Sequence, residues 1–578
     1  MSQRTVAEPS GPAKPAFRKI KVIMPLKSSL PDVETPKLDV LSYLFPADRE
    51  PSDRPIWIDS QDPQEFLTPR QLLLWVKRFG LGLDNLGIKR GEAVMILTPN
   101  HIFVPVAYLG IVGSGRCFSG ANPIYTVEEI AYQIEDISAS VLLVHHSLID
   151  HAITAARRVG LSKARIFLFS ESPNQDINGV KDWRTILGTV EQGQRWQWPR
   201  LSPQQSMTTV ATVNYSSGTT GPPKGVCISH YNLIANVEQY SVVRYATQDE
   251  REHHPDEKWC GFLPLYHAYG QLHTILMCIR LDVPVYVMKQ FVFEDLLRAI
   301  QRFKVTRLQV APPILVMLNK RPETKKYNLS SIQEILCGAA PLRAELQNDI
   351  ARRFGLTTIQ GWGMTEVTCG AIIIPTWERD DGSGSVGRLI PNMEAKLLDD
   401  DDKEVNDGQP GELHVRGPNI CLGYWRNEQA TKDTLLSGGW LKTGDVAIVR
   451  NGRFWIVDRK KELIKVNALQ VAPAELEAAL LEHDDVADAA VVGITLSHDE
   501  EYPRAYIVLK DESKGKVTAS DIHMWSRKRL AKHKWFVGGV SFIEEVPRLA
   551  SGKIQRKVLR AWSQRDTPEM ERQVRPRL

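Results

Sequence analysis

The sequence predicts an α/β protein with a large N-terminal domain and a smaller α+β C-terminal domain. Up to about residue 385, short apolar segments of strand composition alternate with segments of helical periodicity. Such alternation is typical of parallel-rich sheets sandwiched by helices. Closely spaced hairpin patterns follow, and a second α+β pattern begins after Asp458.

The N-terminal elements are predicted in chain order. Residues 1–35 are rich in Pro, Lys and Ser without a period, which predicts a flexible tail. The alternation then predicts a strand at 93–97, helices at 102–112 and 127–137, and strands at 141–144, 283–288 and 308–310.

The remaining elements divide into hairpins and a C-terminal domain. Strand patterns at 394–398, 411–415 and 454–457, with turn signals at 406–408 and 451–452, predict hairpins. Beyond them we expect a helix at 473–481, strands at 489–492 and 505–509, a helix near 520–532 and a solvated basic tail. We place the N-terminal domain at residues 36–457 and the C-terminal domain at 458–578.

Composition excludes several classes of protein. A chain of 578 residues with 43% hydrophobic and 24% charged residues is neither collagen, coiled coil nor mostly disordered. Its 72 Lys and Arg against 68 Asp and Glu give a net charge of +4, which does not indicate nucleic-acid binding. The seven cysteines are widely spaced without a CxxC pair, which indicates free thiols. No apolar run reaches the roughly 18 residues of a membrane span, so we expect a soluble intracellular protein.

The segment YSSGTTGPPKG, residues 215–225, is the strongest chemical motif. Its glycines let the backbone approach a ligand, its hydroxyls donate hydrogen bonds, and its lysine supplies a point charge for phosphate. It is not a Walker A loop, because Lys224 is followed by Gly225 rather than Ser or Thr. The predicted phosphate-binding residues are Ser216, Ser217, Gly218, Thr219, Thr220, Gly221 and Lys224.

A second glycine-rich string is rejected as a cofactor site. Residues 382–387 satisfy GxGxxG, but a dinucleotide fingerprint must follow a strand and open a helix. Here a charged segment precedes the string and a strand pattern follows it, so we predict a loop.

Three further strings carry suitable chemistry. PLYHAYG (264–270) places His267 between aromatic residues, and QGWGMTE (360–366) offers a ring, a hydroxyl and a carboxylate. WLKTGD (440–445) ends in an aspartate suited to two sugar hydroxyls. Each string alone is more often a packed residue or a common turn, but their order along one chain favours a shared site.

In this order the motifs resemble those of adenylate-forming enzymes, the superfamily of acyl-CoA synthetases, luciferases and peptide-synthetase adenylation domains. The likeness is greatest to 4-coumarate–CoA ligase-like enzymes and runs from about Leu38 to Trp562. Further matching strings are GAAPL (338–342), GELHVRGPNICLGYW (411–425), the block at 458–477 and PRLASGKIQRK (547–557). The resemblance implies that the hairpins form a small β-barrel-like part and that the C-terminal domain is mobile, turning about Asp458.

The resemblance implies an ATP-dependent acid–CoA ligase with ATP, Mg²⁺ and coenzyme A as cofactor and substrates. The acid, aromatic and phenylpropanoid-like or of medium chain length, would form acyl-AMP and pyrophosphate, and CoA would then displace AMP. The alternative is a stand-alone enzyme that loads a carrier protein. A luciferase-like oxygenase is a more remote alternative. A catalytically silent ligand-binding relative would have lost the residues at its phosphate-binding and lysine positions, whereas here Lys224, Glu366, Asp445 and Lys553 are all present.

The resemblance also assigns roles to residues. Gly361, Trp362 and Gly363 would lie at adenine, Thr365 at the α-phosphate and Glu366 at Mg²⁺, while Asp445 and Arg459 would bind ribose. Lys553, in a Ser-Gly-Lys frame, would be the catalytic lysine, acting with His267, Thr365 and Glu366. The acyl pocket would be built by His267, Tyr269, Gly338, Cys369 and Gly370.

Two features depart from the family pattern or extend beyond it. Lys465 and Gln470 match the block near the thiol tunnel, but Asn467 and Ala468 replace the usual Lys-Gly, which affects the thioester step. The C-terminal Pro576-Arg577-Leu578 resembles a peroxisomal address weakly, so we expect a cytoplasmic protein with the peroxisome as the alternative.

Overall fold

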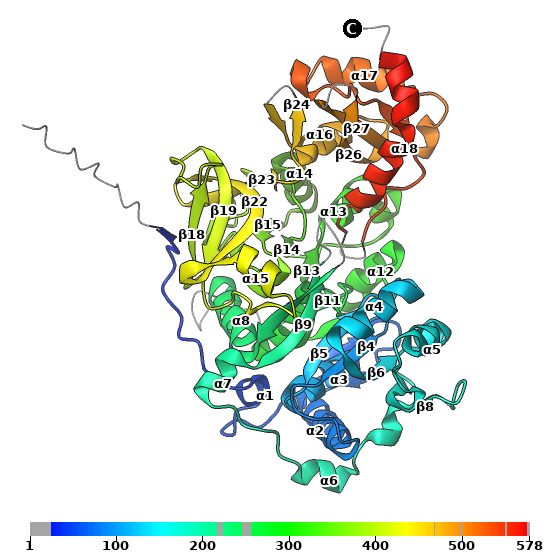
Figure 1. Ribbon diagram of the computed structural model, residues 1–578, viewed down its shortest axis with the longest axis vertical. Helices are drawn as coiled ribbons and strands as arrows, with labels where there is room; N and C mark the ends of the chain where they lie inside the picture. Colours follow the sequence, from blue (N-terminus) through cyan, green and yellow to red (C-terminus); the bar gives the residue numbers. More distant parts are fainter. Residues whose placement is uncertain are drawn as a thin grey trace, which may run out of the picture.

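The structure is a computed structural model that describes residues 25–216, 223–245, 256–466, 469–496, 500–549 and 552–574. Figure 1 shows a large N-terminal part, blue to yellow, and a smaller C-terminal part, orange and red, above it. The predicted α/β architecture with two parts of unequal size is confirmed.

The first sheet carries the predicted phosphate loop. In the described part of the chain its order is β20-β10-β9-β5-β4-β6-β7-β8, parallel from β9 to β8 and antiparallel around β10. The antiparallel pairing of β9 and β10 places Ser216 opposite Lys224, and residues 217–222 of the predicted loop lie outside the described part of the chain. The strands are β4 (Ala93–Leu97), β5 (Cys117–Ala121), β6 (Ala139–Val144), β7 (Ile166–Leu168), β8 (Lys181–Asp182), β9 (Val210–Ser216), β10 (Lys224–Ser229) and β20 (Gly423–Tyr424).

The second sheet carries the aromatic and glycine-rich strings at its strand ends. Its described order is β17-β16-β15-β14-β13-β11-β12-β2-β3, parallel from β15 to β2. The strands are β2 (Trp57–Asp59), β3 (Phe66–Leu67), β11 (Trp259–Gly261), β12 (Val285–Val287), β13 (Arg307–Val310), β14 (Glu334–Cys337), β15 (Thr357–Trp362), β16 (Ile372–Ile373) and β17 (Arg388–Leu389).

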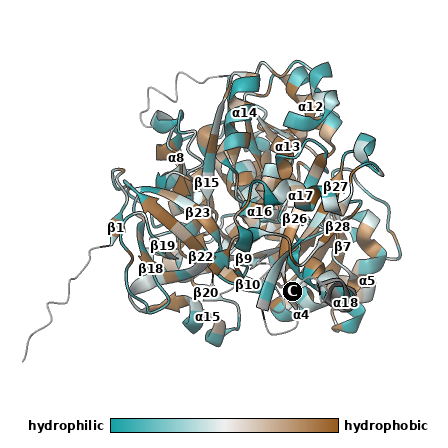
Figure 2. Cartoon of the chain, turned by 90° about the horizontal axis from the view of Figure 1, so that it is seen from above, coloured by the Kyte–Doolittle hydropathy of each residue, from teal (hydrophilic) through white to brown (hydrophobic). Residues whose placement is uncertain are grey.

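The helices beside these sheets bury their apolar residues and leave their polar residues exposed. α3 (Val104–Gly113) is apolar all round and buried at every residue, whereas α4 (Val127–Ile137) is amphipathic and begins at a capping box of Thr126 and Glu129. In Figure 2 teal, the hydrophilic colour, gathers on outer helices such as α12 and α14. The other helices here are α1 (Val40–Leu44), α2 (Pro69–Asn85), α5 (Ile149–Arg158), α6 (Val190–Arg195), α7 (Pro203–Thr208), α8 (His230–Arg244), α10 (Ala268–Gly270), a π-helix (Gln271–Met277), α11 (Cys278–Leu281), α12 (Phe293–Phe303), α13 (Pro312–Lys320) and α14 (Ala344–Phe354).

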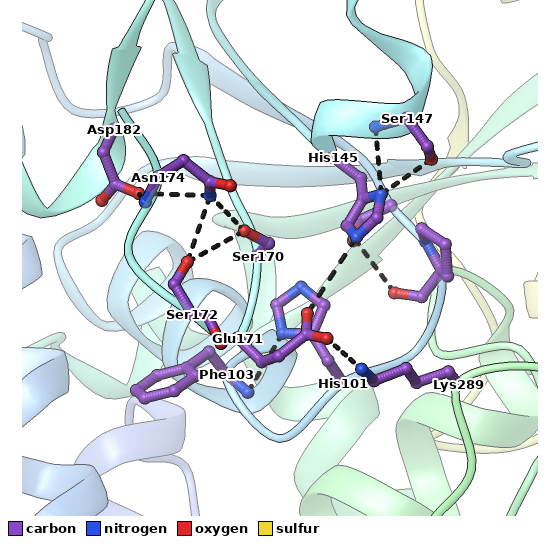
Figure 3. Close-up of polar contacts among 12 residues, drawn as sticks. His101, Phe103, His145, Ser147, Ser170, Glu171, Ser172, Asn174, Asp182 and Lys289 are labelled. Atoms are coloured by element: carbon purple, nitrogen blue, oxygen red, sulfur yellow. Dashed lines mark hydrogen bonds and ion pairs between the residues drawn. The ribbon is translucent and has the colours of Figure 1, made fainter. Parts of the chain in front are cut away.

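A polar cluster joins the two sheets at the ends of their strands (Figure 3). Glu171, after β7, pairs with Lys289, after β12, and its Oε2 lies 4.0 Å from Nε2 of His145. His101 is buried beside them, and burial lowers the pKa of its imidazole to about 3. The ion pair between Glu171 and Lys289 therefore links the two sheets.

The hairpin region forms a third sheet in the described order β1-β18-β19-β22-β21, with β23 on β22. β1 (Leu26–Lys27) pairs with β18, so for these residues the prediction of a flexible tail at 1–35 is wrong. Leu26 and Lys27 form a short strand along the edge of the sheet formed by β18. The other elements are β18 (Glu394–Leu398), β19 (Pro410–Arg416), β21 (Leu435–Leu436), β22 (Trp440–Arg450), β23 (Arg453–Arg459) and α15 (Glu428–Thr434).

The C-terminal part has the predicted α+β pattern and one helix that we did not predict. The stretch expected as a solvated basic tail contains α18 (Arg556–Val574), whose Leu559 and Trp562 pack on the C-terminal sheet. The other elements are β24 (Ile464–Val466), β25 (Leu469–Val471), α16 (Pro473–Leu481), β26 (Val486–Leu496), β27 (Glu500–Leu509), α17 (Ala519–Arg527) and β28 (Val540–Phe542).

Candidate active site

Two cavities meet where the C-terminal part faces the N-terminal part. The larger is a cleft of about 1160 Å³, and the smaller is an adjoining cavity of about 40 Å³ that shares lining residues with it. Lys553 and Trp362 line both. Predicted nucleotide residues in the cleft are Gly361, Trp362, Gly363, Asp445, Arg459 and Lys553. Predicted acyl residues in the small cavity are His267, Tyr269, Gly338 and Cys369, and Thr365 also lines it.

Asp445 lines the cleft, and each of its carboxylate oxygens has a partner. Its Oδ2 accepts a hydrogen bond of 2.8 Å from the indole N–H of Trp362. Its Oδ1 lies 3.4 Å from Nε of Arg459, the register partner of Asp445 on β23. Burial raises the pKa of the Asp445 carboxyl, against the opposing effect of Arg459. Asp445 is therefore linked to Trp362 by a hydrogen bond and to Arg459 by an ion pair.

The backbone brings Lys553 into both cavities. The Leu549 N–H donates to the Lys553 carbonyl at 2.8 Å, and Arg548 donates to the Gly552 carbonyl at 2.9 Å. Gly552 has a φ of +83°, and a Cβ there would lie 2.9 Å from Cβ of Ala311. The glycine of the Ser-Gly-Lys frame is thus required both by its left-handed backbone and by contact with the N-terminal domain.

The charges around Lys553 act on its amine in opposite directions. Burial, followed by the positive charge of Arg459, lowers the pKa of Lys553 to about 8, although Asp445 and Glu366 act to raise it. An ordinary lysine amine stays charged to about pH 10, whereas this lowered pKa brings the loss of charge of the Lys553 amine into the mildly alkaline range.

Glu366 lies in a 3₁₀ helix, Thr365–Val367, and is buried. Its Oε1 accepts a hydrogen bond of 2.9 Å from the hydroxyl of Tyr424, and its Oε2 makes no hydrogen bond to a described residue. The ammonium of Lys224 lies 5.2 Å from the ring centroid of Tyr424. Tyr424 therefore connects the predicted phosphate loop to the predicted metal ligand.

His267 lines the small cavity. Its Nδ1 accepts from the Tyr269 N–H at 3.4 Å, and burial with the nearby charge of Lys553 lowers the pKa of its imidazole to about 3. A neutral imidazole whose Nδ1 accepts carries its proton on Nε2. Nε2 of His267 is therefore a hydrogen-bond donor.

Lys320 and Arg343 connect the N-terminal part to α16 beside the cleft. The Lys320 amine donates to the carbonyls of Leu481 (3.0 Å) and Val486 (2.8 Å). Arg343 donates to the Glu475 carbonyl and pairs with Glu482 at 3.1 Å. Lys320 places its charge at the C-terminal end of α16, where a cation is stabilising, and both side chains link the N-terminal part to the domain that carries Lys553.

Some predicted residues are not in the cavities. Lys465 and Gln470 are exposed register partners on the β24–β25 hairpin, and Gly370 packs under the hydroxyl of Tyr240. Residues of our prediction that lie outside the described part of the chain are Ser217, Gly218, Thr219, Thr220, Gly221, Asn467 and Ala468.

Two residues of the site were missed by the sequence reasoning. Tyr424 lies within the GYW string that carried the resemblance, so a motif marked its position but not its role. Tyr240 lines the small cavity from α8, where a lone tyrosine is more often a core residue and no pattern distinguishes it.

Comparison with known proteins gives the family. The profile of the AMP-binding enzyme family matches residues 46–425, and that of the AMP-binding enzyme C-terminal domain matches residues 475–553. The chain belongs to the AMP-binding enzyme family. Our predicted boundary at Asp458 lies between the two matched segments and stays a prediction.

Curated relatives in this family are named as acyl-CoA synthetases or CoA ligases. An acyl-CoA synthetase, ACTT5, of Alternaria alternata is 36% identical over 524 residues, 88% of this chain and 87% of that protein. A phenylacetyl-CoA ligase, epaB, of Aspergillus niger is 34% identical over 543 residues, 91% of this chain and 97% of that protein.

A solved structure agrees with these matches. The anthranilate CoA ligase AuaEII in complex with anthranoyl-AMP has a TM-score of 0.78 at 25% sequence identity, and the match covers 93% of this chain and 99% of that chain.

As in our expectation from the sequence, no helix among the described residues is long and apolar enough to span a membrane.

Proposed function

We propose that this AMP-binding enzyme is an ATP-dependent acid–CoA ligase. A carboxylate oxygen of the acid attacks the α-phosphorus of ATP, the bond to pyrophosphate breaks, and acyl-AMP forms. A thiolate of CoA then attacks the acyl carbon, and AMP leaves. The observation that carries the proposal is the position of Lys553, which lines both the small cavity and the cleft.

The side chains support an electrostatic role for the protein in the first step. The acid would lie in the small cavity with its carboxylate toward Lys553 and His267, and ATP would lie in the cleft over Trp362 with its ribose at Asp445. The carboxylate of the acid and the phosphates of ATP are both negatively charged and repel each other. The site therefore contributes by positioning the two reactants and by neutralising their charge. The ammonium of Lys553 would bridge the two reactants.

The residues also fit a Mg²⁺ ion at Glu366. Mg²⁺ prefers carboxylate oxygen and nucleotide phosphates, and Glu366 offers one oxygen that no described residue uses. When bound, the ion would neutralise phosphate charge. Tyr424 would hold the carboxylate in place.

Coenzyme A is the acceptor we propose, because the curated relatives are named as an acyl-CoA synthetase and a CoA ligase. No observation favours loading of a carrier protein. For the cellular site, a relative of Arabidopsis thaliana that is 34% identical over 538 residues is named a peroxisomal OPC-8:0-CoA ligase. The C-terminal Pro576-Arg577-Leu578 lies outside the described residues, and we propose the cytoplasm with the peroxisome as the alternative.

The test is a two-stage assay with a panel of acids. Cinnamic, benzoic, phenylacetic and medium-chain acids are each supplied with ATP and Mg²⁺, and pyrophosphate exchange is measured. Accepted acids are then supplied with CoA, and thioester is measured. Exchange without thioester would exclude CoA as the acceptor, and no exchange with any acid would exclude the proposed reaction.

Acyl-AMP formation should decline at alkaline pH. Lys553 is charged below its pKa of about 8 and neutral above it, and a neutral amine cannot neutralise phosphate. We expect kcat/KM for exchange, which reports the free enzyme, to fall by about tenfold per pH unit above that value. In Lys553→Arg any residual activity should lack this decline, since a guanidinium stays charged. A flat wild-type profile to pH 10 would contradict the assignment.

Removing the contacts at α16 should slow the first step alone. We expect Lys320→Ala/Arg343→Ala to reduce acyl-AMP formation by about tenfold, because charge-assisted hydrogen bonds that hold the C-terminal domain are lost. Thioester formation from supplied acyl-AMP should be unchanged. The matched control is Lys325→Ala/Arg352→Ala, which removes the same charges from exposed positions nearby. An equal loss in both steps would indicate a general structural effect.

A further inference from the structure

We propose that helix α4 positions the predicted phosphate-binding lysine, Lys224, through the side chains of Tyr132 and Asp136. The inference rests on the proposed function, in which Lys224 would bind the β- and γ-phosphates of ATP. Tyr132 and Asp136 would touch no substrate and would act through the backbone that carries the lysine.

Lys224 lies where the pairing of the strands ends. β10 begins at Lys224, whose register partner on β9 is Ser216, and the residue before it is Pro223. A proline has no N–H and cannot donate a hydrogen bond to a neighbouring strand. The backbone on this side of Lys224 therefore depends on other contacts.

Tyr132 supplies such a contact from α4. Its hydroxyl donates a hydrogen bond of 2.9 Å to the carbonyl of Pro223. Pro223 lines the cleft together with Tyr125 and Glu129. The hydrogen bond therefore holds the peptide that joins Pro223 to Lys224, at the edge of the proposed ATP site.

Asp136 lies one helical turn after Tyr132, so the two side chains share a face of α4. Its Oδ2 accepts a hydrogen bond of 2.5 Å from the hydroxyl of Tyr215, and its backbone carbonyl accepts one of 3.1 Å from the indole N–H of Trp425. Burial, followed by the hydrogen bond to Asp136, raises the pKa of the Tyr215 hydroxyl, which therefore stays protonated as the donor. Tyr215 and Trp425 belong to the chain segments on either side of β10.

These two aromatic residues enclose Gly225, the residue that follows Lys224. Tyr215 is its register partner, and the backbone N–H of Trp425 donates to its carbonyl at 2.7 Å. A Cβ on Gly225 would lie 3.2 Å from Cβ of Trp425 and 3.3 Å from Cζ of Tyr215. The partners of Asp136 therefore pack directly against Gly225.

The side chain of Lys224 has only a weak contact of its own. It is partly exposed, and its ammonium lies 5.2 Å from the ring centroid of Tyr424. A cation–π contact is weak where water reaches the cation. Because a charge must be placed accurately to act on a phosphate, the backbone contacts from α4 should decide how well Lys224 binds it.

Titration of ATP and of AMP into the free enzyme tests the proposal. ATP with Mg²⁺ carries the β- and γ-phosphates that Lys224 would bind, and AMP lacks them. Tyr132→Phe removes the hydrogen bond to Pro223, and Tyr215→Phe removes the one to Asp136. We expect each variant to raise the Kd of ATP by about tenfold and to leave the Kd of AMP within about twofold. An unchanged Kd of ATP in both variants would overturn the proposal.

The matched control is Tyr327→Phe. It removes a hydroxyl that donates to the carboxylate of Glu294 at 2.7 Å, elsewhere in the N-terminal domain, and it should change neither Kd. Equal losses of affinity for ATP and AMP in Tyr132→Phe and Tyr215→Phe would indicate a general structural effect and would also overturn the proposal.

A second background shows whether the effect depends on Lys224. Lys224→Ala should itself weaken ATP binding, and adding Tyr132→Phe or Tyr215→Phe to it should raise the Kd of ATP by less than about twofold. Substitutions that act on one shared group are not additive, whereas independent effects multiply. The full tenfold loss in the Lys224→Ala background would therefore exclude positioning of this lysine.

The titrations separate this proposal from the proposed function, because they need neither an acid nor turnover. If no acid supports exchange, the ligase reaction is wrong, while the affinities still report whether α4 acts through Lys224. If exchange is normal and neither variant changes the affinity for ATP, the ligase reaction stands and only the role of Tyr132 and Asp136 fails.

Discussion

Replacing Lys553 with alanine should abolish acyl-AMP formation and leave thioester formation from supplied acyl-AMP intact. Lys553 is the cation that lines both cavities, and its backbone is fixed by Gly552 and Arg548. Removing a preorganised charge at a developing charge typically costs about 10²- to 10³-fold in rate. We therefore expect at least that loss in pyrophosphate exchange.

The two half-reactions make this result specific. Exchange reports the first step, and purified acyl-AMP with CoA reports the second. Lys528→Ala, an exposed lysine of the same domain, should leave both unchanged. If Lys553→Ala retains exchange, the lysine is not the catalytic group, and if both steps fail together, the variant has lost its structure.

Replacing Glu366 with glutamine should raise the Mg²⁺ requirement of the first step and lower its rate by about 10²-fold or more. The substitution keeps size and hydrogen bonding but removes the negative charge that a hard cation needs. Tyr424 should still contact the amide oxygen. The measurement is exchange as a function of Mg²⁺ concentration.

Tyr424→Phe separates the effect of the negative charge of Glu366 from the effect of the position of its carboxylate. It leaves the carboxylate but removes the hydrogen bond of 2.9 Å to Oε1, so we expect a smaller loss of about tenfold with a similar metal requirement. Glu345→Gln removes a charge from an exposed helix position and serves as the control. An unchanged Mg²⁺ dependence in Glu366→Gln would place the metal elsewhere.

The sequence predicted elements best where local signals agree with the tertiary structure. The strand at 93–97 and the helices at 127–137 and 473–481 have the predicted bounds, because apolar periodicity, caps or Pro mark them. β1 has two residues and exists only through pairing with β18, and α18 is mostly polar. Neither has a local signal strong enough to predict it.

The same distinction holds for the site. Strings such as Ser-Gly-Lys and Thr-Gly-Asp marked Lys553 and Asp445, since the chemistry depends on those residue types. The small cavity is also lined by Tyr240 of α8 and Leu336 of β14, which stand alone in the sequence. Only the fold brings these two residues to one cavity, so no spacing in the sequence could predict them.

The hydrogen bond between Trp362 and Asp445 has a consequence for nucleotide affinity. In the proposed complex the ribose hydroxyls of ATP would donate to Asp445, whose Oδ2 already accepts a hydrogen bond from the Trp362 indole. A ribose hydroxyl would share that oxygen with the indole or replace the indole, so the weakened contact with the indole would reduce the gain from binding ribose. The indole also gives the buried carboxylate a hydrogen-bond partner when no nucleotide is bound.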